Sequence, residues 1–366
     1  MKVLFCLNHP AHYHLCKNAI SQLKADGNDV FILARPKDVL LDLLKNENYE
    51  TVPIKKGKNL IEKIKLHSSA LNYAVEYAKK IKPDFVTGTG NFYEISHRLG
   101  IPSWLLTEDD ATTNFMLFVD NILSNRKYTG ILSPIVCNNS VLEKRSVKYN
   151  SYHELAYLHP NNFTPDRTVV DKYFPSDKPY FILRFAQLNA YHDLGISGIN
   201  TEIAQRLIDI LKPHGAIYIT SERSLESQFE QYRIKIDPLD MHHVMAFSSL
   251  YIGDSQTMAA EAAVLGVPFI RYNDFVGRIG YLNELENVYH LGFGIKASEK
   301  GSADKMYKTL TDLLAMPNLK EEWQNRRQKM LSEKIDYAKF LTWFIENYPE
   351  SAEIMRKNPE YQNNFK

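Results

Sequence analysis

Three histidines near the amino terminus are the first side chains that could do chemistry. The stretch NHPAHYH places His9, His12 and His14 directly after the apolar run KVLFCL. A neutral imidazole has a pKa of about 6.5, so it can take a proton from an attacking hydroxyl near neutral pH. We predict that His12 is a catalytic base and that His9 contacts the substrate. At least one of the three is expected to be an ordinary helix-face residue.

Two later turns place polar groups at the ends of apolar runs. In TGTGN, we predict that Gly88, Thr89 and Gly90 form a nest of backbone N–H groups for an anion or a sugar. In TEDD, Glu108 and Asp109 are candidates for a catalytic base or for carboxylates that hold sugar hydroxyls. The alternative is that TEDD is only a helix N-cap with solvated neighbours.

The stretch GDSQTMAAEAAVLG joins an apolar run to a helix made almost wholly of small residues. The junction comprises Asp254, Ser255, Gln256 and Thr257. The first N–H groups of such a helix, and its dipole, favour a phosphate. Glu261 follows about one and a half turns later, where its carboxylate would suit the two hydroxyls of a ribose. The alternative makes Asp254 an N-cap and Glu261 a solvated helix residue.

Further candidates for the same nucleotide site lie at other strand ends. A guanidinium binds phosphate in a bidentate way, so Arg184 could offset the charge of a diphosphate. The remaining candidates at a strand end are Ser221, Glu222 and Arg223, in the stretch ITSER. For each of these, a structural role in the core or on the surface is the alternative.

Composition bounds the class of protein. The chain has 366 residues, which favours two domains, and a net charge of +1, which argues against a nucleic-acid partner. Its three cysteines are widely spaced, which fits a reducing cytoplasm. No apolar run reaches the roughly 18 residues of a membrane span. We expect a cytoplasmic protein, with peripheral contact at the inner face of a membrane as an alternative.

The candidate residues must be positioned by a recurring strand-turn-helix pattern. Fully apolar strands that alternate with amphipathic helices are typical of parallel sheets covered on both faces. The pattern is interrupted in AYLHPNNFTPDRTVVDKYFPSDKP, which is rich in Pro, Asn and Asp. We therefore predict an α/β protein with one domain at 1–172 and a second at 173–366. Ligands of such sheets bind beyond the carboxyl ends of the strands.

The stretch GDSQTMAAEAAVLGVPFI resembles the nucleotide-binding signature of the GT-B superfamily. Its closest look-alikes are the non-hydrolysing UDP-N-acetylglucosamine 2-epimerases, which have an Asp-Ser-Gly-Gly start and a glutamate seven residues after the Asp. Glu261 is likewise seven residues after Asp254. The stretches ELAYLHPNNFTPD, AYHDLGISGI, ITSER and GDSQTM together look like the prokaryotic family called domain of unknown function 354. That family is regarded as GT-B-like and often accompanies surface-polysaccharide biosynthesis.

The resemblance implies two Rossmann-like domains that face a cleft, with a C-terminal helix crossing back to the first domain. The second domain would hold a nucleotide diphosphate-sugar. Ser255 and Thr257 would meet its diphosphate, Glu261 its ribose, and His192 would lie near the same diphosphate. Met241 and His242 fall where such proteins place the loop and helix that flank the base of the nucleotide; a core amphipathic helix is the alternative. The first domain would hold the acceptor and the base.

A departure from the epimerase pattern bears on the reaction. The epimerases have an acidic residue in a His-Gly-Asp-Thr turn, where this chain has Thr87, Gly88, Thr89 and Gly90. Glu108 falls where those enzymes have a glutamate, but its partner aspartate is replaced by Thr89. Epimerisation by elimination and re-addition is weakened by this loss. A glycosyl transfer needs only one base and groups that stabilise the departing diphosphate.

We therefore expect a metal-independent glycosyltransferase that uses a nucleotide diphosphate-sugar, most simply UDP-linked, in surface polysaccharide or glycoconjugate biosynthesis. The nucleotide-sugar is its substrate, and no cofactor is expected. The partners would be a glycan or lipid-linked acceptor and, as an option, a second copy of the chain in a homodimer. The alternatives are a non-hydrolysing or hydrolysing nucleotide-sugar 2-epimerase and a non-catalytic nucleotide-sugar-binding subunit.

Overall fold

The computed structural model describes residues 1–37, 39–53, 60–89, 92–110, 128–174, 178–185, 198–221 and 224–366, with the side chains of 60–65 and 67 left out. These residues form two compact units. Unit 1 contains residues 1–157 and 334–366, and unit 2 contains residues 158–333.

Unit 1 is built on a parallel sheet with the strand order β3-β2-β1-β4-β5-β6-β7. Its strands are β1 (Lys2–Leu7), β2 (Asp29–Ala34), β3 (Tyr49–Thr51), β4 (Phe85–Gly88), β5 (Ser103–Leu106), β6 (Gly130–Pro134) and β7 (Ser146–Tyr149). From β1 the chain adds β2 and β3 on one side, and then it returns to place β4 on the other side of β1. The strand order therefore reverses between β1 and β4.

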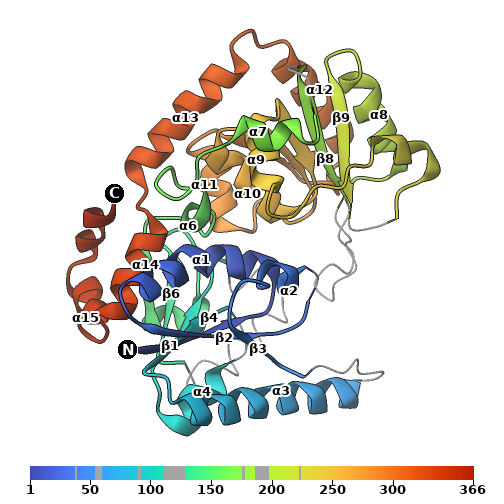
Figure 1. Ribbon diagram of the computed structural model, residues 1–366. Helices are drawn as coiled ribbons and strands as arrows, with labels where there is room; N and C mark the ends of the chain where they lie inside the picture. Colours follow the sequence, from blue (N-terminus) through green and yellow to red (C-terminus); the bar gives the residue numbers. More distant parts are fainter. Residues whose placement is uncertain are drawn as a thin grey trace. The chain divides into compact units, whose positions relative to one another are not determined.

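Helices cover both faces of this sheet, as its apolar strands require. They are α1 (Pro10–Ala25), α2 (Leu40–Leu43), α3 (Leu60–Ile81), α4 (Tyr93–Leu99) and the short turns η1 (Ser140–Arg145) and α6 (Leu155–Leu158). Figure 1 shows α1 on one face and α3 with α4 on the other. Pro10 begins α1, where its missing N–H costs no hydrogen bond, and Gly27 follows its end with a φ of 84°.

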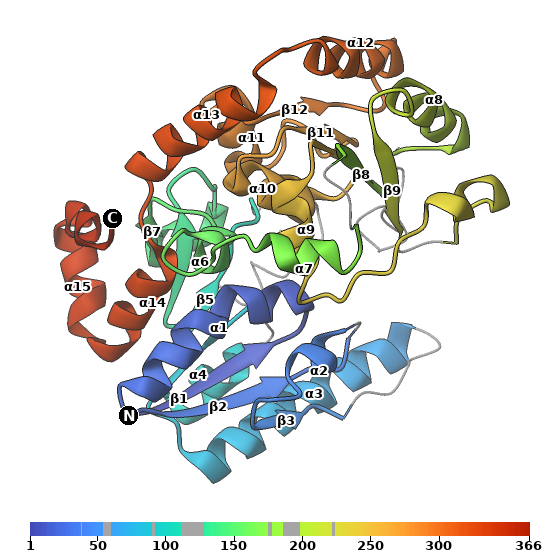
Figure 2. The ribbon, with the colours of Figure 1, turned by 45° about the horizontal axis from the view of Figure 1, so that its top comes forward.

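The carboxyl-terminal residues complete unit 1. They form α14 (Tyr337–Glu346), α15 (Glu350–Lys357) and η3 (Pro359–Phe365). Helix α14 lies beside α1 (Figure 2). The ring of Phe344 packs edge-on against Trp104 of the sheet, with 4.7 Å between centroids, so the apolar face of α14 is buried in the core of this unit.

Unit 2 is built on a second parallel sheet, with the strand order β12-β11-β10-β8-β9. Its strands are β8 (Tyr180–Phe185), β9 (Ala216–Ser221), β10 (Leu250–Gly253), β11 (Phe269–Tyr272) and β12 (Gly292–Ile295). Here the chain runs from β8 to β9 and then returns to place β10 on the other side of β8. The order therefore reverses between β8 and β10.

The helices of unit 2 are α7 (Arg167–Asp171), α8 (Thr201–Leu211), η2 (Ser227–Tyr232), α9 (Met241–Phe247), α10 (Gln256–Leu265), α11 (Gly280–Asn287), α12 (Ser302–Leu314) and α13 (Leu319–Glu333). Helices α8 and α12 lie together on one face of the sheet, and α9, α10 and α11 lie on the other (Figure 2). The expectation of two parallel, helix-covered α/β sheets is thus confirmed.

The segment just after the first unit packs on the second. The composition of the sequence predicts a domain boundary at 172/173, whereas residues 158–172 belong to unit 2 in the structure. The reason is packing on α9: the Phe163 ring lies 4.7 Å from the ring of His243, and the backbone N–H of Asp166 donates to His243 Nδ1 at 3.0 Å. Composition alone marked this Pro- and Asp-rich segment as a linker.

Within the described residues, no helix is both long and apolar enough to cross a membrane.

Gly88 is fixed by the close approach of β4 to β1. It pairs with Cys6 across the two strands and has a φ of 135°. A Cβ atom there would lie 2.1 Å from the Cys6 carbonyl oxygen, which is backbone and cannot move aside. Gly100, in contrast, has a φ of 67° but open space around its missing Cβ.

We predict that Gly88→Ala lowers the free energy of unfolding by about 2 kcal/mol or more, because it adds a backbone clash to an unfavourable φ. Gly100→Ala is the matched control and should cost only about 1 kcal/mol, since it brings strain without a clash. Urea unfolding of the three proteins measures both losses. Equal losses would show that the structure relieves the clash with Cys6, and that the close approach of the two strand ends does not require glycine at position 88.

Candidate functional site

In unit 2, the predicted nucleotide residues lie where the strand order reverses. The last residue of β10, Gly253, pairs with Arg184 of β8. A Cβ atom at Gly253 would lie 2.9 Å from the Cβ of Arg184, so glycine allows the two strand ends to approach. Reversal points of this kind are where open α/β sheets bind ligands, outside the carboxyl ends of the strands. Arg184 is half-buried there.

The turn from β10 into α10 is closed by Ser255. Its hydroxyl oxygen accepts from the Met258 N–H at 3.4 Å, which makes Ser255 the N-cap of α10. The alternative of Asp254 as the cap is wrong, because Asp254 precedes the cap and is buried. Gln256 and Thr257 form the first helical turn and are half-buried. The first N–H groups of α10 therefore begin at the reversal point, as an anion site requires.

Glu261 is not a solvated helix residue. Its side chain is buried, and its Oε1 lies 2.9 Å from Nε2 of His242 on α9. The structure thus brings together two residues that the sequence named separately. This pairing holds the carboxylate in one orientation, about one and a half turns after the start of α10. Met241, the other candidate on α9, is half-buried at the start of that helix.

The loop before α7 packs on α9, the helix that carries His242. The Phe163 ring lies 4.7 Å from His243 and edge-on to His242 at 6.2 Å. The backbone N–H of Asp166 donates to His243 Nδ1 at 3.0 Å. Sequence reasoning quoted this HPNNFTPD segment as a family motif but gave it no structural role. The structure shows that this segment packs on α9, the helix that carries His242, the partner of Glu261.

A buried network supports the β10–α10 turn from behind, and the sequence analysis missed it. Arg271 of β11 is fully buried and donates from Nε to Glu286 Oε1 at 2.9 Å. Its Nη1 donates at 3.4 Å to Asn273, whose amide donates in turn to the Asp254 carbonyl at 2.8 Å. A buried arginine needs such partners. The signal in the sequence was one charged residue within the apolar strand PFIRYN.

The other candidates in unit 2 fall into two groups. Ser221 donates to the Phe185 carbonyl of the neighbouring strand at 3.4 Å, so its hydroxyl ties β9 to β8. His192, Glu222 and Arg223 lie outside the described residues.

In unit 1, the histidines stand where its own strand order reverses. His9 caps α1, because its Nδ1 accepts from the Ala11 N–H at 3.2 Å. Nδ1 of His12 accepts from the Asn8 N–H, also at 3.2 Å. A neutral ring that accepts at Nδ1 carries its proton on Nε2. His14 is buried on α1 with its ring 5.3 Å from Tyr157, the helix-face role expected of one of the three.

This hydrogen bond bears on the expected role of His12. Burial, together with the nearby His9, His153 and Lys37, lowers the pKa of His12 to about 3, so the ring is neutral near pH 7. Since its Nδ1 is already used as an acceptor, the group that it can offer a ligand is the Nε2–H. The geometry therefore favours His12 as a hydrogen-bond donor over the predicted base.

Glu108, at the end of β5, is paired with a histidine that sequence reasoning missed. Its Oε2 accepts from the His153 N–H at 3.1 Å, and its Oε1 lies 3.4 Å from His153 Nδ1. Burial and the charge of Asp109 raise the pKa of Glu108 to about 8, while burial lowers the pKa of His153 to about 3. Near pH 7 the proton thus stays on the carboxyl. Asp109 itself is exposed.

His153 follows the carboxyl end of the parallel strand β7 by four residues. Because β7 has the sequence SVKY and is not an apolar run, the pattern that located the other candidates gives no signal there. The strand end also lies close to the predicted domain interruption, which begins at Ala156.

The turn after β4 differs from the expected anion nest. The Thr89 N–H donates to the Cys6 carbonyl at 3.3 Å, so this amide is used within the sheet edge. Gly88 is held against the same carbonyl. Gly90 lies outside the described residues. Gly88 is thus explained by the close packing of β4 against β1 and not by the binding of an anion.

Solved structures of similar fold include UDP-GlcNAc 2-epimerases and glycosyltransferases. UDP-GlcNAc 2-epimerase from Neisseria meningitidis, bound to UDP-GlcNAc, is 14% identical with a TM-score of 0.64, over 94% of this chain and 99% of that one. The calicheamicin glycosyltransferase CalG4 is 13% identical with a TM-score of 0.59, over 95% and 99%. S. aureus MnaA, solved with UDP, is 14% identical with a TM-score of 0.66, over 96% and 97%.

At these identities, the similarities show the fold, which is the two-domain GT-B fold. A comparison with curated proteins finds none that matches. The sequence profile of the DUF354 family, described as proteins of unknown function, matches residues 1–277. The chain belongs to the DUF354 family.

Proposed function

We propose that the protein transfers a sugar from a nucleoside diphosphate-sugar, most simply UDP-linked, to the hydroxyl of a glycan or lipid-linked acceptor. The observation that carries this proposal is the turn from β10 into α10 at the reversal point of unit 2. There a helix N-terminus, an arginine on the neighbouring strand and a buried carboxylate oriented by a histidine are brought to the same strand ends.

The donor would be held by unit 2. The diphosphate would rest on the N-terminus of α10 with Ser255 and Thr257 beside it, and the Arg184 guanidinium would offset its charge. Glu261, oriented by His242 at 2.9 Å, would accept from the ribose hydroxyls. The UDP-GlcNAc and UDP bound in two structures of the same fold support this choice of ligand.

The acceptor would be activated by unit 1. Glu108, as a carboxylate, would take the proton of the acceptor hydroxyl as that oxygen bonds to the anomeric carbon of the sugar. The bond from that carbon to the diphosphate breaks, and the electron pair leaves with the diphosphate to the positive end of α10. The Nε2–H of His12 would hold the acceptor in place. A pKa near the working pH suits a base, and Glu108 has one.

The reaction class is tested by its products. With UDP-sugars and an acceptor mixture, we expect UDP to be released only when an acceptor is present. The freed UDP is measured by hydrolysing it with a phosphatase and detecting the phosphate. Proton NMR of the UDP-sugar without acceptor tests the epimerase alternative, for which Thr89 removes one of the two carboxylates. A new C2 epimer in that control would overturn the transferase assignment. Binding without either product would favour a non-catalytic subunit.

The donor site is tested by Glu261→Gln. This change keeps the shape of the side chain and a hydrogen-bonding partner for His242, but it removes the charge that would accept from the ribose. Charge-assisted hydrogen bonds are about twice as strong as neutral ones, so we expect the Kd for UDP to rise roughly tenfold. Calorimetric titration measures it. Glu299→Gln, an exposed change in the same unit, is the control, and an equal Kd in both variants would remove Glu261 from the site.

The base is tested by pH. Because burial and Asp109 raise the pKa of Glu108 to about 8, kcat/KM should rise with pH and level off above about 8. Glu108→Gln should abolish that rise. Asp109→Asn removes a neighbouring negative charge, so it should lower the apparent pKa while keeping the activity. Loss of activity in Asp109→Asn with the rise retained in Glu108→Gln would make Asp109 the base.

A further inference from the structure

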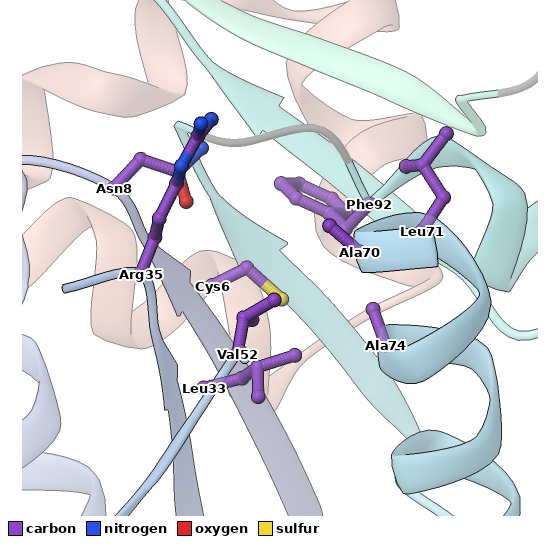
Figure 3. A pocket seen from close by; sticks show the side chains of 9 residues that line it. All are labelled: Cys6, Asn8, Leu33, Arg35, Val52, Ala70, Leu71, Ala74 and Phe92. Atoms are coloured by element: carbon purple, nitrogen blue, oxygen red, sulfur yellow. The ribbon is translucent and has the colours of Figure 1, made fainter. Parts of the chain in front are cut away.

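Unit 1 contains a small pocket beside its reversal point (Figure 3). Its volume is about 40 Å³, more than the roughly 10–15 Å³ that one water requires. One wall is formed by the ends of β1 and β2, through Cys6 and Leu33, and the opposite wall is formed by α3, through Ala70 and Ala74 (Figure 3). The two alanines leave the space that larger side chains on α3 would fill.

The interior of the pocket is apolar. Leu33, Val52 and Ala74 are buried around it, and the ring of Phe92 closes one side. Cys6 is buried as well, and burial raises the pKa of its thiol, so it contributes an uncharged, weakly polar surface. A space with such a lining favours an apolar group over ordered water, which needs two to four polar partners.

The polar lining residues are Asn8 and Arg35. Figure 3 shows their side chains together, on the side of the pocket away from Ala70 and Ala74. Arg35 directly follows β2 and is exposed, and among the described residues its guanidinium makes no hydrogen bond or ion pair. None of the described residues that line the pocket has a carboxylate. A guanidinium in such a place binds a phosphate or carboxylate in a bidentate way.

The pocket adjoins His12, the residue that would hold the acceptor in the proposed function. Asn8 lines it with its side chain, and its backbone N–H holds the ring of His12 at 3.2 Å. A ligand seated in the pocket would therefore lie next to His12. Lys37 adds to the positive charge felt by this histidine.

We propose that this pocket selects the acceptor: it binds the short apolar substituent, such as an N-acyl group, of an anionic sugar whose phosphate or carboxylate is held by Arg35. This inference rests on the proposed transferase function and specifies its acceptor class. The substituent occupies the apolar interior, and the anion stays at the mouth, where water reaches it and no buried charge is created.

Four monosaccharides separate the two parts of the proposal. N-acetylglucosamine 6-phosphate has both the acyl group and the anion, glucose 6-phosphate has only the anion, N-acetylglucosamine has only the acyl group, and glucose has neither. Titrations of the full chain, followed by ligand-observed NMR, give their Kd values. We expect the first sugar to bind roughly tenfold more tightly than either sugar that lacks one group. Equal Kd values for all four, or no binding, would make the pocket a packing void only.

Two variants assign the preferences to the pocket. Arg35→Gln changes an exposed residue and should abolish the preference for phosphate while keeping that for the acyl group. Ala70→Leu, at a half-buried position on α3, fills the interior and should abolish the preference for the acyl group alone. The controls are Lys80→Gln, which removes the same charge elsewhere, and Ser69→Leu, which adds the same side chain on the exposed face of α3. A preference that survives in its variant overturns the assignment.

The outcome is separable from that of the donor site. UDP would be bound by unit 2, so all four variants should keep the wild-type Kd for UDP. Failure of the wild-type chain to bind UDP would sink the proposed function without altering the sugar ratios. Equal sugar affinities with normal UDP binding would sink only the acceptor proposal.

Discussion

The parallel hydrogen-bonding of the strands is the constraint on which the candidate site depends. In a parallel sheet all carboxyl ends lie at one edge, so residues far apart in sequence meet there without any further device. Each sheet of this protein is extended to one side of a central strand and then to the other. The two connections at the reversal diverge, one over each face, and leave the strand ends open. His12 stands at one such point, and Arg184 with Ser255 stands at the other.

Close backbone approach is the second requirement, and glycine meets it twice. Gly88 sits against the Cys6 carbonyl in unit 1, and Gly253 sits against Arg184 in unit 2. Both are the last residues of strands that border a reversal point. The two carboxylates that matter for the proposed chemistry each have a histidine partner. Glu261 is oriented by His242, and Glu108 is held by His153 with its proton retained near neutral pH.

The features that could be predicted from the sequence are those that follow from the spacing of apolar residues and from the positions of strand ends. Apolar runs predicted the parallel sheets, and the strand-to-helix junction at Asp254 predicted the start of α10. The pairing of Glu261 with His242 was beyond it, because residues 19 positions apart meet only through the packing of α9 on α10. The same holds for His153, whose partner lies 45 residues away. The TGTG turn was interpreted as an anion nest because a glycine needed for strand contact and one needed for a ligand look alike in sequence.

Residues 334–366 belong to unit 1, so the chain of unit 2 is an insertion within that of unit 1. During synthesis on the ribosome, all of unit 2 emerges before the first unit can be finished. Until then Trp104 lacks Phe344, and Tyr149 lacks Tyr337, whose ring lies 4.3 Å away in the folded protein. The aromatic core at this side of the sheet must wait for the last helices. The amino-terminal unit, although made first, is therefore the last to become complete, and the nascent chain must keep its unfinished core from other partners in the meantime.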